Sequence, residues 1–305
     1  MDADAALARL VEQRGPLTGA ELLAALPPGS SAFGCWRAAK RSERVDVRAV
    51  GARYLRLDQK VEGYARLSPS ILREFLTYTV VGAVGDATAL ERKAAEVLAH
   101  ARAVSRAKFE LAAGVIGGIA ARLADDATAT GRACVFIAGD VVYEMAHDVP
   151  RPERSTGRMV RGSDLDLVVL VDDAAPDALL ERLDDEIYQQ KYRHLINPSA
   201  REEIDYIVKR MSRLRQQMAF DSFKRMVACK VLQEGVFLHG DRDLFAAAKA
   251  LLDDSGVARR LVELEAEAAR RRREAEERLL ATEPGRLGAD ELHLFFTADE
   301  SEEFE

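Results

Sequence analysis

The chain has 305 residues, of which 48% are apolar and 31% charged, and its 44 basic and 51 acidic side chains give a formal charge of −7. This balance excludes a largely disordered protein and a membrane-embedded one, because apolar runs such as residues 112–121 are far too short to span a bilayer. The three cysteines lie about a hundred residues apart, which argues against a disulfide framework or a zinc knuckle. We expect a cytoplasmic protein of two or three domains, with neither a signal peptide nor a membrane partner.

The first 58 residues predict a winged helix-turn-helix domain. Three short apolar-periodic stretches separated by proline and glycine predict three helices, and Thr18 with Glu21 predicts a capping box at the start of the second. Residues 45–50 and 53–57 then alternate apolar and charged side chains around Gly51. That alternation is typical of the two strands of a wing.

This N-terminal domain is basic although the whole chain is acidic. Seven bases and two acids lie between Arg37 and Arg56, a local charge of +5, and such a face is suited to phosphate groups. We predict nucleic-acid contact here, but small winged helices also act as protein-docking modules, and Trp36 suits a core as well as a stacking platform. The residues assigned to nucleic-acid binding are Arg37, Lys40, Arg41 and Arg44.

The segments on either side of the central region predict helices. Residues 59–127 predict a helical connector with one long helix from 87 to 123, and residues 243–284 predict C-terminal helices. Within the latter, the charged residues 270–273 are interpreted as a solvated helix face.

Residues 285–305 predict an acidic tail. From Asp290 onward the chain carries seven acids and no Lys or Arg, so the rest of the protein has no net charge. Such a like-charged end is usually solvated, although apolar residues such as Phe295 could dock on the folded part. Together with the preceding helix, the tail is also a candidate surface for a homo-oligomer or another partner.

Carboxylates interrupt two apolar stretches near the middle of the chain, where strands normally exclude them. Asp164 and Asp166 stand at the entrance of the run 165–171, and because side chains alternate on a strand, the two project from one face about 6.6 Å apart. Asp205 lies within a second run, 204–208. If the strands are neighbours, three carboxylates meet, and divalent metal is the simplest relief of their repulsion. Oxygen ligands favour Mg²⁺ or Mn²⁺, which also bind substrate phosphates, so the predicted substrate is a nucleoside triphosphate.

An earlier apolar strand ends in Gly139-Asp140, and helical spacing over 141–146 predicts a tight turn followed by a helix N-terminus. Gly139, the Ser163-Asp164-Leu165-Asp166 segment and Asp205 together resemble the DNA polymerase β-like nucleotidyltransferase superfamily over residues 131–241. The resemblance implies a small mixed sheet flanked by helices, within a core placed at residues 128–242. It also implies that Asp164 and Asp166 bind both catalytic metals and Asp205 one of them, while a hydroxyl attacks and pyrophosphate leaves.

Two features depart from the family pattern. Asp140 stands where a serine is usual, so an acid replaces the hydroxyl that would contact a triphosphate. The segment between Gly139 and Asp164 is long and carries four arginines, which are suited to a triphosphate, to an acceptor strand or simply to solvent. The residues assigned to nucleotide contact are Gly139, Asp140, Ser163 and, on a helix after the third aspartate, Lys224.

The predicted architecture is therefore α+β: a winged helix-turn-helix, a helical connector, a polymerase β-like core with a mixed sheet, and C-terminal helices. The predicted function is transfer of a nucleoside monophosphate from an NTP or dNTP to a hydroxyl. The acceptor is either a nucleotide, giving a signal in bacterial antiphage defence, or an RNA, protein or small molecule. The alternative, supported by Asp140, is a DNA-binding regulator or toxin–antitoxin component whose nucleotidyltransferase domain senses nucleotide without turnover.

Overall fold

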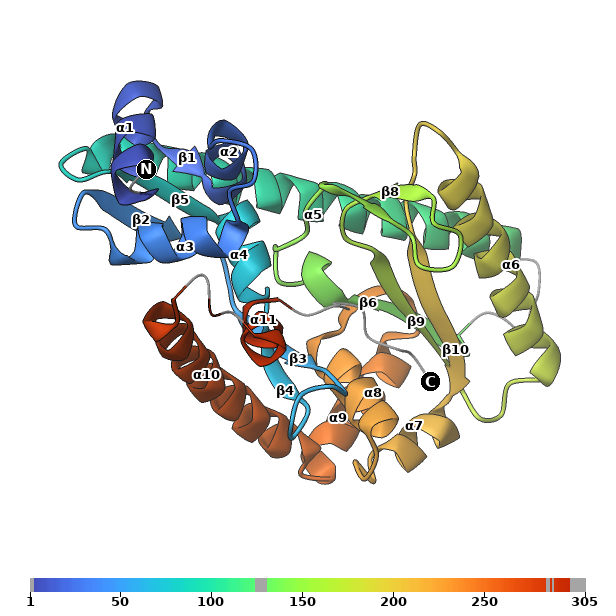
Figure 1. The fold of residues 1–305 in the computed structure, drawn as a ribbon. Helices are drawn as coiled ribbons and strands as arrows, with labels where there is room; N and C mark the ends of the chain where they lie inside the picture. Colours follow the sequence, from blue (N-terminus) through green and yellow to red (C-terminus); the bar gives the residue numbers. More distant parts are fainter. Residues whose placement is uncertain (1–2, 124–130, 284–285, 287, 297–305) are drawn as a thin grey trace. The chain divides into compact units, whose positions relative to one another are not determined.

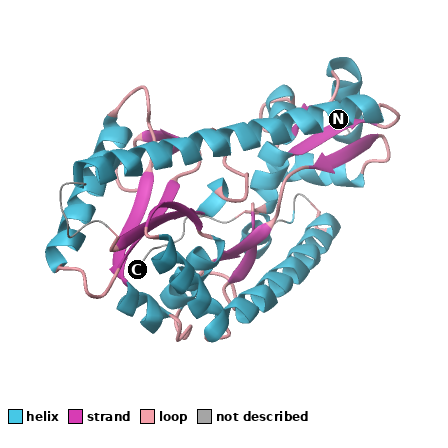
Figure 2. Ribbon diagram, turned by 180° about the vertical axis from the view of Figure 1, so that it is seen from behind, coloured by secondary structure: helices cyan, strands magenta, loops and turns pink. Residues whose placement is uncertain are grey.

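A computed structural model describes residues 3–123, 131–283, 286 and 288–296 as a mixed α+β protein (Figure 1). These residues group into two compact units. Unit 1 holds the chain up to His100 together with the segment that starts at Leu264, and unit 2 holds Ala101–Glu263. The described strands form four small sheets rather than one continuous sheet (Figure 2). Among the described helices, none is long and apolar enough to cross a membrane.

Unit 1 starts with three helices and a short strand. The predicted capping box is confirmed: the Glu21 N–H donates to the Thr18 hydroxyl, and the Thr18 N–H donates to the Glu21 carboxylate at 2.7 Å. Trp36 is 2% exposed and belongs to the core that these helices share, so of the two roles left open for it, the core holds. The elements are α1 (Ala3–Arg14), β1 (Leu17–Thr18), α2 (Gly19–Ala25) and α3 (Ala32–Arg41).

The strand pairing predicted for the wing is wrong. β2 (Val45–Ala49) pairs with β5 (Thr79–Ala83) in a sheet of order β1-β5-β2, whereas β3 (Tyr54–Leu57) pairs with β4 (Ala65–Ser68). Every residue of β3 is buried, so this strand needs cover on both faces and is not the half-exposed wing strand that its alternation indicated.

The predicted helical connector is also wrong in its first part. β4, α4 (Ile71–Tyr78) and β5 precede the long helix, because the chain returns to complete both small sheets. The long helix itself, α5 (Ala87–Leu123), has the predicted bounds.

The C-terminal segment packs into the core of unit 1. α10 (Val257–Ala281) contributes Leu279, and α11 (Ala289–Phe295) contributes Phe295, whose ring centroid lies 5.3 Å from that of Phe33 and 5.5 Å from that of Trp36. The start of the predicted acidic tail is therefore docked rather than solvated. Residues 297–305, which carry most of the tail's acids, lie outside the described residues.

Unit 2 contains a four-stranded mixed sheet of order β10-β9-β6-β11. β6 (Ala133–Ala138) is antiparallel to both β9 (Leu165–Val171) and β11 (Val236–Gly240), and β10 (Ile204–Arg210) is parallel to β9. Parallel neighbours require a crossover, which α6 (Asp177–Ile196) supplies.

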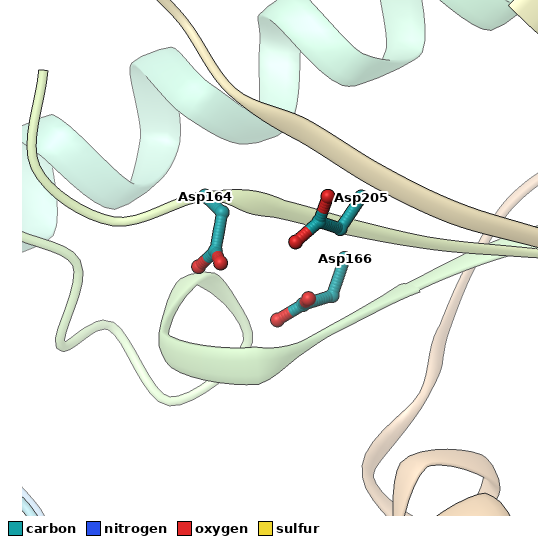
Figure 3. Close-up of side chains that lie close together, drawn as sticks. All are labelled: Asp164, Asp166 and Asp205. Atoms are coloured by element: carbon teal, nitrogen blue, oxygen red, sulfur yellow. The ribbon is translucent and has the colours of Figure 1, made fainter. Parts of the chain in front are cut away.

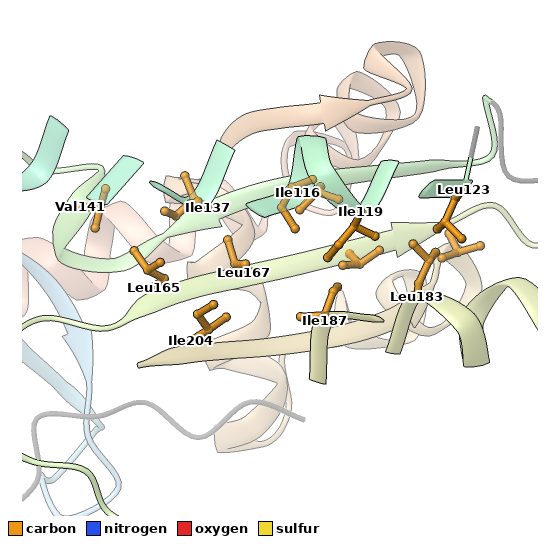
Figure 4. Close-up of a cluster of buried hydrophobic side chains, with 14 of the residues drawn as sticks. Ile116, Ile119, Leu123, Ile137, Val141, Leu165, Leu167, Leu183, Ile187 and Ile204 are labelled. Atoms are coloured by element: carbon orange, nitrogen blue, oxygen red, sulfur yellow. The ribbon is translucent and has the colours of Figure 1, made fainter. Parts of the chain in front are cut away.

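The two faces of this sheet are covered by different helices. α5 and α6 cover one face through an apolar cluster that includes Ile116, Leu167 and Ile187 (Figure 4). On the other face, the Phe136 ring lies 5.5 Å from that of Phe245 in α9 (Arg242–Asp254). α7 (Met211–Gln217) and α8 (Phe223–Glu234) follow β10. The central strands β6 and β9 are mostly buried, whereas the edge strands β10 and β11 are partly exposed.

Between β6 and β9 the chain forms a 3₁₀ turn, η1 (Gly139–Val141), and a hairpin of β7 (Pro150–Pro152) and β8 (Met159–Arg161). The helix predicted over 141–146 is wrong. Glu144 adopts a left-handed φ of 59°, and the Ala146 N–H donates to the Ser105 hydroxyl at 3.0 Å instead of to a helical carbonyl. Burial of Val141 and Met145 in a turn produced the helix-like spacing.

Candidate metal centre

Three aspartates converge at the entrance of strands β9 and β10. Asp166 and Asp205 stand directly opposite each other in the parallel register, and Asp164 precedes Asp166 by two residues, on the same face of the sheet. Their ligand oxygens all lie within 4.8 Å of one another, and Figure 3 shows the carboxylates directed into the same space. Carboxylates this close repel one another, so the group is suited to a divalent cation with oxygen ligands.

The Gly139 turn packs directly against this cluster. Ala138 is the β6 neighbour of Asp166, and Gly139 then turns with a φ of 75°. A Cβ at this position would collide with the Asp166 carboxylate. Position 139 therefore favours glycine for its left-handed backbone, and a side chain there would displace the Asp166 carboxylate.

The backbone N–H of Gly139 is used within the protein. It donates to Oε1 of Glu234 at 2.9 Å, and Oε2 of Glu234 lies 2.5 Å from the Nζ of Lys230. Both side chains are almost fully buried. Because no α-helix starts here, the turn also lacks the helix N-terminus that the sequence predicted.

Asp140 and Ser163 bind each other. The Ser163 hydroxyl donates to Oδ2 of Asp140 at 2.9 Å and accepts the His147 N–H at 3.2 Å. Asp140 is 7% exposed and Ser163 is 3% exposed. Both residues predicted to contact nucleotide are thus enclosed and join the η1 turn to the start of β9. Lys224, the fourth predicted residue, is exposed in the first turn of α8.

Among the described residues, Lys191 and Arg151 reach the aspartate cluster, and of these two only Arg151 lies in a segment that the sequence singled out. Lys191 of α6 donates to Oδ1 of Asp205 at 2.8 Å. Arg151 of β7, one of the four arginines before Asp164, places Nη2 3.5 Å from Oδ2 of Asp164 and 2.8 Å from Oε2 of Glu203. Its Nε donates to the Gly162 carbonyl at 2.8 Å. Nothing in the local sequence around Lys191 signals this role, because the contact depends on the path of α6.

Glu203 adds a fourth carboxylate beside the cluster. Burial raises the pKa of Glu203 to about 7; Arg151 opposes this shift, whereas Asp164 and Asp205 add to it. Glu203 precedes β10 by one residue, and its carbonyl accepts the Leu165 N–H at 3.0 Å. Sequence reasoning missed this residue, which lies outside the apolar run that drew attention to Asp205.

The segment that carries the four arginines is an ordered hairpin. Glu153 accepts hydrogen bonds of 2.5–2.8 Å from the N–H and hydroxyl groups of Ser155 and Thr156. Burial alone would raise the pKa of Glu153, but these hydrogen bonds outweigh it and lower the pKa to about 2. Three of the four arginines of this segment are exposed on the hairpin, namely Arg154, Arg158 and Arg161.

The predicted nucleic-acid residues of unit 1 do not form one free basic face. Arg37 donates through Nε to the Leu280 carbonyl at 3.1 Å, and Arg41 donates to the same oxygen at 3.4 Å. Arg44 lies 3.5 Å from a Glu12 oxygen, and Lys40 is exposed. Cations at the C-terminal end of a helix stabilise its last carbonyls, so part of the basic charge of α3 is directed at α10.

The charged residues 270–273 of α10 form a solvated face only in part, since Arg270 and Arg273 are exposed but Arg272 is not. Arg272 of α10, assigned to a solvated face, is 7% exposed; it donates to the Pro69 carbonyl at 2.8 Å and to Glu276 at 2.8 Å. A long side chain on a charged helix is thus part of the packing of unit 1.

Comparison of the chain with family models, with curated proteins and with solved structures gives no match.

Proposed function

We propose that unit 2 is a metal-dependent nucleotidyltransferase core. It would transfer a nucleoside monophosphate from an NTP or dNTP to a hydroxyl acceptor and release pyrophosphate. The observation that carries the proposal is the convergence of Asp164, Asp166 and Asp205, whose ligand oxygens lie within 4.8 Å of one another on adjacent strands. The likeness of this pattern to the DNA polymerase β-like superfamily supports the choice of reaction.

The all-carboxylate donor set fits Mg²⁺ or Mn²⁺. When bound, a pair of such ions supplies Lewis-acid stabilisation of the attacking and leaving oxygens of an in-line displacement. Asp164 and Asp166 would hold both ions, and Asp205 would share the one nearer the acceptor, where it can also accept the proton of the attacking hydroxyl. Gly139 allows the Asp166 carboxylate to occupy its place against the turn.

The deciding experiment incubates the full chain with each NTP and dNTP in the presence of Mg²⁺ or Mn²⁺ and resolves the products by mass. Asp166→Ala must lose product formation, whereas Asp185→Ala, an exposed acid on α6, must keep it. Products linked to a second nucleotide would favour synthesis of a signal, and labelled RNA, protein or small molecule would favour the other acceptors. Absence of any product with every nucleotide, alone and with cell extract as a source of acceptor, would overturn the proposal.

A second function is favoured by the state of the Gly139 turn. Its N–H is donated to Glu234, and Asp140 is held by Ser163, so the groups that would contact triphosphate are already engaged. A regulator or toxin–antitoxin component that binds nucleotide without turning it over is consistent with this arrangement. That function predicts bound NTP and no pyrophosphate release, so measurable pyrophosphate release that Asp166→Ala abolishes would exclude it.

We also infer that unit 1 is a winged helix with an insertion in its wing. The order α1, β1, α2, α3, β2 and a sheet of order β1-β5-β2 support this inference. The inserted segment holds β3, β4 and α4, which explains why the local strand pairing was misjudged. Because α3 contacts the C-terminal segment, its role as a protein-docking module gains support relative to nucleic-acid binding.

A further inference from the structure

Arg151 and Lys191, the described cations that contact the aspartate cluster, differ in how firmly they are held. Arg151 is fixed by its Nε donation to the Gly162 carbonyl, and its guanidinium pairs with Glu203 as well as lying near Asp164. Lys191 contacts the cluster only through its terminal ammonium, at Oδ1 of Asp205. An ammonium on a flexible four-carbon stem can move without any backbone change, whereas an anchored guanidinium fork cannot.

Lys191 contacts Asp205 at the edge of the sheet, where β10 is the last strand. It lies near the C-terminal end of α6, the helix that joins β9 to the edge strand β10. Its side chain is 29% exposed and that of Asp205 is 28% exposed. The ion pair is therefore open to solvent on one side, so the ammonium can leave Asp205 without becoming buried and unpaired.

A divalent ion and Lys191 compete for the same carboxylate. An ion held by Asp164, Asp166 and Asp205 brings two positive charges to the group that now binds the ammonium, and like charges at such separations repel strongly. The ammonium must then withdraw from Asp205, and this withdrawal weakens metal binding relative to a cluster without Lys191.

The phosphates of an incoming nucleotide offer Lys191 a new partner. Mg²⁺ and Mn²⁺ bind substrate phosphates together with a few carboxylates, so phosphate oxygens arrive beside the cluster that Lys191 has left. The N–H of Gly139 is already donated to Glu234, and Asp140 of the same turn is bound by Ser163. A cation from the Asp205 side is better placed to neutralise phosphate charge than that turn is.

We propose that Lys191 is the exchangeable counter-cation of the aspartate cluster: it neutralises Asp205 in the absence of metal, is displaced when a divalent ion binds, and then binds a phosphate of the nucleotide. This inference rests on the proposed function, since it assumes that the cluster holds metal and that the substrate carries phosphates. It assigns Lys191 opposite effects on the two ligands. A residue that only fixed α6 to β10 would not have such effects.

The test measures two affinities of the full chain, for Mn²⁺ without nucleotide and for inorganic triphosphate at saturating Mn²⁺. Lys191→Met should bind Mn²⁺ about two- to fivefold more tightly, as loss of a half-exposed ion pair allows. It should bind triphosphate about tenfold more weakly or worse, as loss of a charged hydrogen bond implies. Lys191→Arg retains the charge and should restore both affinities to near the wild-type values.

Arg193→Gln is the matched control, because it removes one exposed positive charge from the same helix; both of its affinities should equal the wild-type values. Far-UV circular dichroism of each variant establishes that the overall helix content is unchanged. If Lys191→Met binds Mn²⁺ no more tightly than the wild type, or if both affinities fall together, the exchange is overturned. If instead the wild type and Asp166→Ala bind Mn²⁺ equally well, the metal site itself, and with it the proposed function, is overturned.

Discussion

The sequence marks two regions of clustered charge, and the charged side chains of the two regions are arranged in opposite ways. In unit 2, Asp164, Asp166 and Asp205 converge, because side chains alternate along a strand and the parallel register places all three on the same face of the sheet. In unit 1, the bases of α3 diverge: Arg37 and Arg41 turn to a carbonyl of α10, while Lys40 remains exposed. Long side chains on a helix surface follow whatever packs beside them. Charge clustered in a sequence is therefore stronger evidence for a ligand where the backbone fixes the side chains.

Substitution of Gly139 by alanine tests the aspartate cluster, whose side chains the backbone fixes. It should have the largest effect on metal affinity and stability. The new Cβ would collide with the Asp166 carboxylate at a left-handed φ of 75°. We expect Mn²⁺ affinity to fall by about tenfold to a hundredfold and the free energy of unfolding to fall by about 2–4 kcal/mol. Isothermal titration with Mn²⁺ and urea unfolding measure the two quantities.

Gly157→Ala is the control for that substitution. Gly157 has a similar φ of 69°, but among the described residues no atom lies within 4 Å of its Cβ position. The free energy of unfolding of Gly157→Ala should fall by only about 1 kcal/mol, and its Mn²⁺ affinity should be unchanged. Equal losses of Mn²⁺ affinity in the two variants would show that the turn does not position Asp166.

Phe295→Ala tests the cover over α3. Its ring packs on Phe33 and Trp36, and we expect unit 1 to lose about 2 kcal/mol, less than a central core phenylalanine would cost, because α11 can undock. Trp36 is the only tryptophan of the chain, so its fluorescence reports on unit 1 alone and should shift to the red. Phe296→Ala, at an exposed position, should leave emission and stability unchanged; a red shift of the same size there would contradict the docking of α11.

The same contrast explains what the sequence could predict. Local rules succeed where partners are near in the chain: the Thr18 and Glu21 capping box, the bounds of α5, and the spacing of Asp164 and Asp166. They fail where the partner is distant. The pairing of β2 with β5 depends on a return of the chain after an insertion of 29 residues, between Ala49 and Thr79.

The candidate site divides along the same line. Its carboxylates follow from apolar strand patterns, which can be read locally. The contact of Lys191 with Asp205 depends on where α6 passes the edge of the sheet. Outside the site, the burial of Arg272 in unit 1 likewise depends on a distant partner, the Pro69 carbonyl. The helix expected after Gly139 shows a further limit, because burial of a few apolar residues in a turn imitates helical periodicity.

Acidification tests whether the hairpin beside the cluster is held by Glu153. Hydrogen bonds from Ser155 and Thr156 hold the pKa of Glu153 at about 2, below the ordinary value of 4.5. A lowered pKa in the folded state means that the stabilisation is fully present above pH 4.5 and is lost as the pH falls through 2. The Gly157 N–H donates to the Glu153 carbonyl. At pH 7, this amide hydrogen should therefore exchange with solvent several-fold faster in Glu153→Gln than in the wild type.

The difference in protection between the two proteins should shrink as the pH approaches 2, where the wild-type carboxylate is itself protonated. Hydrogen exchange, expressed as protection relative to an unstructured chain at the same pH, measures it. A difference that stayed constant over this range would show that charge on Glu153 does not hold the hairpin.

The smallest effect separates the two kinds of base on α3. Arg37 is 12% exposed and binds both the Leu280 carbonyl and Glu283 at 3.1 Å, so Arg37→Gln should lower the stability of unit 1 by about 1 kcal/mol, measured by Trp36 fluorescence in urea. Lys40→Gln should change stability by less than about 0.5 kcal/mol. If α3 also contacts nucleic acid, Lys40→Gln should reduce the salt dependence of that binding by about one unit of slope. The opposite result would be an Arg37→Gln protein that keeps its stability but loses nucleic-acid affinity as strongly as Lys40→Gln does. Arg37 would then be free for phosphate, and α3 would present a continuous basic face.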